Sequence, residues 1–372
     1  MLTASSDVDE FRQQLQQWLA DHPEPAASQL ATAGLVAPHW PRPWGLDADP
    51  ARQLVVDSEL AAAGVELPDN PIAIGWAGPT IVEGGTEEQQ QRWLPSILDG
   101  TDEWCQLFSE PDAGSDLAGL RATAVRDGDD YVVNGQKLWS TWANTSRWGI
   151  LLARTDADAP KHRGISYFVV DMATPGIEIR KIIEMTGGNH FNETFLTDVR
   201  IPAENRIGAE GDGWRLANVT LGNERVSLSE GGVLWGMGPT FQACIDEMRH
   251  RHAGADPLDR QAVAGRFSEG MIGELLTQKI VEAMVDGRDP SPIASIRKAK
   301  TDANAQEMLD LLVDMAGAEG MLGEQSEHAE ETDPWHWAFL FSRALTIGGG
   351  TSEIQRNIIG EKLLGLPREP RG

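Results

Sequence analysis

Apolar and polar residues follow a helical period over the first hundred residues. Three stretches place apolar side chains three and four positions apart: FRQQLQQWLADH at 11–22, ARQLVVDSELAAAG at 51–64 and TEEQQQRWLPSILDG at 86–100. This spacing gives a helix one apolar face that it can bury. The pattern predicts an N-terminal helical domain over residues 1–103.

The period then shortens and later lengthens again. Strand-like runs such as YVVNGQKLWS at 131–140 and GISYFVVDM at 164–172 are separated by turn sequences, which predicts a β-domain over residues 104–213. From residue 214 to 372 the helical period returns, interrupted by GRDPSPIAS at 287–295, whose composition is typical of a loop. The order helical, β, helical predicts an α+β protein of three domains.

Charge and composition narrow the possible partners. The formal net charge of −26 opposes binding to phosphate backbones, so nucleic acid and anionic membrane surfaces are not expected partners. No apolar run approaches the roughly 20 residues that span a bilayer, and MLTASSDVDEFRQQLQQWLA lacks the basic and apolar regions of a signal peptide. We therefore expect no membrane span and a cytoplasmic protein. The two cysteines, Cys105 and Cys244, are expected to be buried free thiols.

One segment of the β-domain combines small residues, hydroxyls and an aromatic ring. In SEPDAGSD, Ser109 to Asp116, the small residues allow a ligand to approach the backbone closely. Downstream, Trp139 offers a flat face beside the hydroxyls of Ser140 and Thr141. This combination suits a planar heterocycle that needs stacking and hydrogen bonds at its edge. By composition alone, a scaffold turn and a packed tryptophan explain the same residues.

The order of these residues resembles the acyl-CoA dehydrogenase family, whose flavin-binding segment reads T/S-E-P-x-A-G-S-D and is followed by a W-x-T strand. The resemblance extends through FNETFLTDVRIPAENRIGAEGDGWRLA to TSEIQRNIIGEKLLGLP near the C-terminus. It implies N-terminal helices, a middle β-barrel and a C-terminal four-helix bundle, with FAD held between domains and across a dimer interface. Ser109 and Thr141 would bind the edge of the isoalloxazine ring, and Trp139 would pack against it. The full set of cofactor-binding residues that it implies is Leu107, Ser109, Gly114, Ser115, Trp139, Ser140, Thr141, Gly350, Thr351 and Glu353.

Dehydrogenation of an acyl thioester requires a base for the α-proton, because the β-hydrogen leaves as hydride to the flavin. In many members of the family this base is a Glu directly before the final G-T-S, where this chain has Gly349. In a subset resembling the isovaleryl and long-chain enzymes the base is a Glu before an Arg on the first long helix of the C-terminal domain. That pair is Glu224-Arg225 here, so we expect Glu224 to be the base, with Glu230 the weaker candidate. Ser115, Arg225 and the backbone N–H of Gly349 are the expected substrate contacts.

Two family motifs that grip FAD are absent or altered. RHRHAGADPLDRQ lacks the usual R-x-x-F-G, and DMAGAEG replaces Q-x-x-G-G-x-G, with Asp314 where an amide is expected. A carboxylate there would repel a pyrophosphate. The chain thus resembles subunits of the α2β2 dehydrogenases of actinobacterial sterol side-chain breakdown, in which a second, homologous subunit completes each site. A homo-oligomer is the alternative.

The family's dehydrogenases pass their electrons to electron-transfer flavoprotein, which makes that protein an expected partner. Two other activities remain possible from the sequence: an acyl-CoA oxidase-like flavoenzyme, or a non-catalytic subunit that stabilises an active partner.

Overall fold

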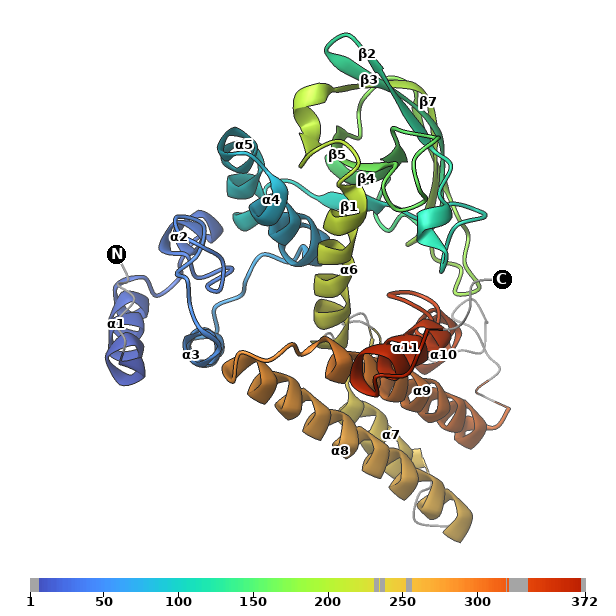
Figure 1. The fold of residues 1–372 in the computed structure, drawn as a ribbon. Coiled ribbons are helices and arrows are strands. Elements are labelled where there is room, and N and C mark those ends of the chain that lie inside the picture. The colour runs from blue at the N-terminus through green and yellow to red at the C-terminus, as the bar shows by residue number, and fades with distance from the viewer. Residues whose placement is uncertain are drawn as a thin grey trace. The chain divides into compact units, whose positions relative to one another are not determined.

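The computed structural model describes residues 7–230, 234, 238–251, 256–318, 320 and 334–368, without the side chains of 225–230 and 334. The chain divides into two compact units (Figure 1). Unit 1 consists of Met1–Glu184 and Asn189–Asn223, and unit 2 of Met185–Gly188 and Glu224–Gly372. Helices together with one sheet confirm the α+β class. Among the described residues, no helix combines the length and the apolar character that crossing a membrane requires.

The predicted N-terminal helices form, and their first residues show why they begin where they do. Asp49 accepts a hydrogen bond from the backbone N–H of Arg52, and Thr86 and Gln89 form a reciprocal capping box. Such caps satisfy N–H groups that have no partner within the helix. The helices of this region are α1 (Val8–Asp21), α2 (Ala27–Ala33), α3 (Pro50–Ala62), the π-helical η1 (Ile72–Ala77), α4 (Gly78–Gly84) and α5 (Glu87–Leu98).

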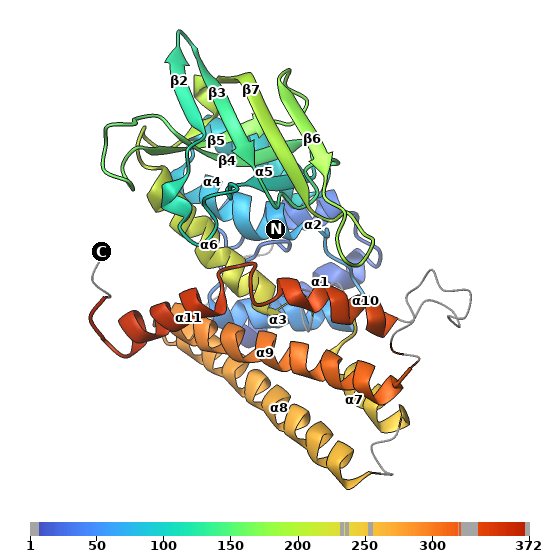
Figure 2. The same ribbon diagram turned by 90° about the vertical axis from the view of Figure 1, so that its right-hand side faces the viewer.

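The rest of unit 1 is built on a single eight-stranded sheet, which Figure 2 shows with β2, β3, β7 and β6 toward the viewer. Its strands are β1 (Trp104–Leu107), β2 (Thr123–Asp127), β3 (Asp130–Lys137), β4 (Trp148–Arg154), β5 (Ile165–Asp171), β6 (Ile177–Lys181), β7 (Asn192–Pro202) and β8 (Arg206–Ile207). Their order is β6-β7-β3-β2-β4-β5-β8, and β1 pairs with β4. β1 is parallel to β4, whereas the long β3–β7 and β4–β5 pairs are antiparallel.

The sheet encloses a core of aromatic and branched side chains. Tyr131 and Phe168 pack edge to face in it, with ring centroids 5.0 Å apart, and Cys105 lies in the same cluster. Cys105 and Cys244 are both free and buried, as expected. Burial raises the pKa of each thiol to about 12, so both remain protonated at neutral pH.

Helix α6 (Gly213–Glu230) follows the sheet in sequence and is attached to unit 1 by a network of buried hydroxyl groups. Thr220 Oγ1 lies 2.8 Å from Thr80 Oγ1 and 3.1 Å from the hydroxyl of Tyr167. Buried hydroxyls need hydrogen-bond partners, and here each finds one on another element. The bonds therefore join α4, β5 and α6. This network fixes the rotation of α6 about its own axis within unit 1.

Substitution of the first glycine of α6 should destabilise unit 1. A Cβ on Gly213 would lie 2.6 Å from the backbone carbon of Ser166, so Gly213→Ala is expected to lower the free energy of unfolding by about 2 kcal/mol. Gly222, two and a half turns later in the same helix, has nothing within 4 Å of an added Cβ. Gly222→Ala should raise that free energy by roughly 0.5–1 kcal/mol. Chemical denaturation compares the two, and equal effects of the two variants would contradict the packing described.

Unit 2 is helical. Its elements are α7 (Phe241–Arg251), α8 (Pro257–Val285), α9 (Ser291–Ala316), α10 (Pro334–Phe341), the 3-10 turn η5 (Ser342–Ala344), α11 (Ser352–Ile358) and the π-helical η6 (Ile359–Leu363). The long helices α8 and α9 lie side by side, and α10 and α11 pack on α9 (Figures 1 and 2). The expected loop at 287–295 is shorter than predicted, since Ser291 already begins α9 and Pro292 is compatible with a first helical turn.

Candidate functional site

The SEPDAGSD segment forms the predicted turn, and a buried carboxylate closes it. Glu110 and Ala113 exchange backbone hydrogen bonds of 3.1 and 3.0 Å. The carboxylate of Glu110 accepts hydrogen bonds from the backbone N–H groups of Arg121 (2.6 Å) and Ala122 (2.9 Å). The turn is therefore tied to the chain that enters β2.

A buried lysine completes this arrangement. Lys137 is fully buried at the end of β3, and its Nζ lies 2.8 Å from Glu110 Oε1 and 3.1 Å from the carbonyl oxygen of Phe108. Burial lowers the pKa of Lys137 to about 8, against the opposing attraction of Glu110. Sequence reasoning missed both residues, although a lysine at the end of a half-apolar strand was a visible signal.

The W-x-T segment is not the strand that the resemblance implied. β3 ends at Lys137, and Trp139 adopts a φ of 61°, in the left-handed region. The residues on either side are held by different segments: Leu138 N–H donates to Ser109 O, and Ser140 exchanges backbone bonds with Asn192. Trp139 turns the chain between these two attachments. A non-glycine residue in this conformation costs roughly 1–3 kcal/mol and occurs preferentially at functional sites.

The turn at Trp139 leaves its flat aromatic side chain exposed to solvent. The indole is 56% exposed and meets Phe191 edge to face, with centroids 5.9 Å apart. Ser109 and Thr141 are half-buried, whereas Gly114 and Ser115 are exposed, and nothing lies within 4 Å of a Cβ added to Gly114. An open indole, hydroxyl groups and room beside a glycine fit a flavin ring.

Leu107 and Ser140, two other expected cofactor contacts, are not part of this exposed surface. Both are fully buried, and the backbone N–H and carbonyl of Ser140 are already bound to Asn192. Ser140 Oγ has no hydrogen-bond partner in the part of the chain that the structure describes.

The expected base lies one helical turn beyond the buried hydroxyl network. Glu224 follows Thr220 by four residues on α6, so both side chains leave the same face of the helix. Glu224 is 6% exposed, which is unusual for a glutamate. The side chain of Arg225, an expected substrate contact, lies outside the described residues, as does that of Glu230.

The glycine run in unit 2 bends the chain into α11. Gly349 and Gly350 have φ values of 64° and 90°, and Thr351 caps α11 by accepting the backbone N–H of Ile354 at 3.3 Å. Glu353, in the first turn, is exposed and pairs with Arg356. Gly349 carries no carboxylate, as the sequence states, and the left-handed turn is one that glycine adopts without strain.

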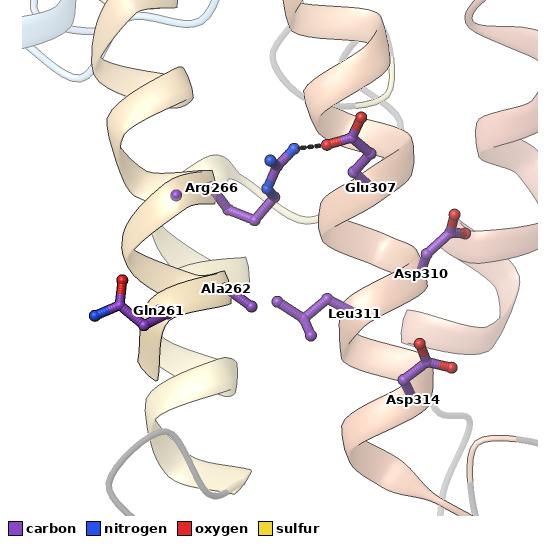
Figure 3. Close-up of a pocket in the computed structure, with 8 residues that line it drawn as sticks. Gln261, Ala262, Arg266, Glu307, Asp310, Leu311 and Asp314 are labelled. Carbon is purple, nitrogen blue, oxygen red and sulfur yellow. Dashed lines mark hydrogen bonds and ion pairs between the residues drawn. The ribbon is translucent and has the colours of Figure 1, made fainter. Parts of the chain in front are cut away.

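A hollow of about 360 Å³ lies between α8 and α9, and its charges are mainly negative. Figure 3 shows Arg266 directed at Glu307, while Asp310 and Asp314 line the hollow from α9. Arg266 also donates to Asn304 Oδ1 at 3.1 Å. Glu307 pairs with Arg266 and Asp310 with Arg343. The remaining carboxylate of the lining, Asp314, therefore leaves the hollow acidic and opposes the diphosphate of a nucleotide.

Models of known protein domains match most of the chain. Three family models match the chain in order: the acyl-CoA dehydrogenase N-terminal domain over residues 7–101, the middle domain over 105–199 and the C-terminal domain over 211–364. The chain belongs to the acyl-CoA dehydrogenase family. It is thereby an oxidoreductase of that family.

Relatives and solved structures of the family resemble the chain over most of its length. It is 46% identical over 340 residues to the acyl-CoA dehydrogenase FadE34 of Mycobacterium tuberculosis, covering 91% of this chain but 46% of FadE34, so it spans about half of that relative. The Tcur3481–Tcur3483 steroid ACAD has a TM-score of 0.78 at 27% identity and covers 99% of this chain and 100% of its own. The ChsE4–ChsE5 complex of M. tuberculosis has a TM-score of 0.76 at 31% identity with the same coverage.

Proposed function

We propose that this acyl-CoA dehydrogenase family member catalyses FAD-dependent α,β-dehydrogenation of an acyl-CoA thioester, with Glu224 as the base. The observation that carries the proposal is the burial of Glu224 in a chain whose other family position for a base is Gly349. A general base must be able to accept the α-proton, and of these two positions only Glu224 carries a carboxylate.

Residues of this chain are proposed for proton abstraction, for stabilising the thioester oxygen and for contacting the substrate. Glu224 takes the α-proton of the thioester. The backbone N–H of Gly349 donates to the thioester oxygen as negative charge develops on it. Ser115 and Arg225 contact the substrate. When bound, FAD supplies the acceptor for the hydride that leaves the β-carbon.

The exposed surface around Trp139 is the proposed seat of the flavin ring. Trp139 packs against the ring, Ser109 and Thr141 bind its edge, and Gly114 and Ser115 give room for close approach. Leu107 and Ser140, both buried, complete the proposed cofactor contacts in unit 1, and the proposed contacts in unit 2 are Gly350, Thr351 and Glu353.

A second, homologous subunit is the proposed structural partner. The hollow between α8 and α9 is lined by carboxylates, Asp314 among them, so this part of the chain is poorly suited to binding the phosphates of FAD. ChsE4–ChsE5 is a complex of two named chains, and the Tcur3481–Tcur3483 protein is a steroid ACAD. By the second likeness we assign the thioester to the steroid class, and from the family resemblance we assign electron-transfer flavoprotein as the acceptor of the electrons.

Co-expression with the product of the neighbouring gene tests the proposal. We expect a complex of two unlike chains that retains FAD and is bleached under anaerobic conditions by a steroid acyl-CoA from a panel of thioesters. Rapid reoxidation by dissolved oxygen would instead identify an oxidase, and a flavin-free chain without bleaching would identify a non-catalytic subunit. A homotetramer with one FAD per subunit would exclude the second subunit.

A further inference from the structure

A second buried lysine lies in unit 2, on α9. Lys298 is 3% exposed, and its Nζ lies 2.6 Å from Asp302 Oδ2, one turn along the same helix. The same Nζ donates to the carbonyl oxygen of Leu345 at 3.1 Å, across 47 positions of sequence. Burial raises the pKa of Asp302, with Lys298 opposing the shift. The ammonium therefore links α9 to the segment that leads into the glycine run.

Another α9 side chain makes the same kind of link two turns later. Gln306 Nε2 donates to the carbonyl oxygen of Ser342 at 2.8 Å and to Thr346 Oγ1 at 3.2 Å. Residues 298, 302 and 306 are spaced by four, so they form one polar row along α9. This row supplies donors to carbonyls that lie where the helix of α10 and η5 ends.

The far end of the glycine run is held by α11. Gln355 is fully buried, and its Nε2 donates to the carbonyl oxygens of Gly349 and Gly350, both at 3.1 Å. A Cβ on Gly350 would lie 2.8 Å from that nitrogen. Because each peptide unit is planar, the bond to the Leu345 carbonyl fixes the N–H of Thr346 and the bond to the Gly349 carbonyl fixes the N–H of Gly350, so the Gly349 N–H lies between two held peptide units.

We propose that Lys298 is a positioning residue that, by binding the Leu345 carbonyl, sets the direction in which the glycine turn presents the Gly349 N–H to the thioester oxygen. The proposal rests on the proposed function for the role of that N–H. A purely structural role for Lys298 would stabilise unit 2 without affecting the chemical step.

The test removes the charge pair as a unit. In Lys298→Met/Asp302→Leu no unpaired charge stays buried, so the fold should tolerate the change, while the bond to Leu345 is lost. We expect kcat for acyl-CoA-dependent flavin reduction in the holo-complex to fall at least about tenfold, with KM within about twofold, because the lost orientation acts on the transition state. The matched control, Lys279→Met/Glu282→Leu, removes an exposed ion pair on α8 in the same way, leaves the bond from Lys298 to Leu345 in place and should retain kcat within about twofold. A Lys298→Met/Asp302→Leu variant with unchanged kcat and a lower melting temperature would overturn the proposal.

A second measurement separates this proposal from the proposed function. Amide hydrogen exchange over residues 346–351 needs no turnover, and we expect it to accelerate about tenfold in the Lys298→Met/Asp302→Leu variant but not in Lys279→Met/Glu282→Leu. Unchanged exchange would refute positioning by Lys298, whereas a wild-type complex that no acyl-CoA bleaches would refute the proposed function. If the Lys298→Met/Asp302→Leu variant fails to fold, Lys298→Met/Asp302→Asn removes the same bond to Leu345, also without an unpaired buried charge, and keeps a polar side chain at position 302. The same fall in kcat is then expected, and an unchanged kcat would count against the proposal.

Discussion

Glu224→Gln is expected to slow the reduction of bound flavin by acyl-CoA by on the order of 10³-fold while leaving the flavin content unchanged. The amide has nearly the shape of the carboxylate but cannot accept a proton, so the change removes general base catalysis alone. Anaerobic stopped-flow absorbance at the flavin band measures the rate, and the resting spectrum measures the content.

Glu230→Gln is the matched control, because Glu230 is an acid on the same helix that we do not assign to catalysis. Its rate should stay within about twofold of the wild type. A wild-type rate in Glu224→Gln would place the base elsewhere, and a slow Glu230→Gln would move the assignment to that residue.

Lys137→Met is expected to destabilise unit 1 by about 3 kcal/mol, because it leaves the buried carboxylate of Glu110 without its cation. The melting temperature should fall by on the order of 10 °C, and bound flavin should be lost with it. Differential scanning fluorimetry and flavin absorbance in the filtrate after ultrafiltration follow both effects.

Two further variants check the cause. Glu110→Gln/Lys137→Met removes the buried charge but keeps only one acceptor oxygen for the N–H groups of Arg121 and Ala122, which bind different oxygens of Glu110, so it should recover part of the lost stability. Lys161→Met, which breaks the exposed pair with Asp116, should change stability by less than about 1 kcal/mol. A double variant no more stable than Lys137→Met would show that the charge is not the cause.

The parts of the fold that the sequence predicted are those set by local pattern. Residues 86–100 carry both an apolar helical stripe and a capping box, and α5 forms there. Residues 164–172 are mostly apolar because β5 is buried on both faces, and this run alone predicted a strand. The loop at 287–295 was overestimated because the helix-starting use of Pro292 competes with the loop reading of the same composition.

The candidate site depended on contacts between distant segments, which a single sequence does not show. The left-handed turn at Trp139 requires Ser109 and Asn192 on its two sides, and the pair of Lys137 and Glu110 spans 27 positions. Glu224 was found through the family resemblance rather than through its helical spacing, which equally describes a solvated glutamate. Its burial is a property of packing.

Both native thiols are sealed inside the protein and protonated at neutral pH. Thiol-directed dyes and spin labels react through the thiolate, so the wild-type chain should stay unlabelled under native conditions. A single cysteine introduced at an exposed position, such as Thr197 on β7, would then carry the only probe. Distances from that probe to a bound flavin could be measured by energy transfer without first deleting any native residue.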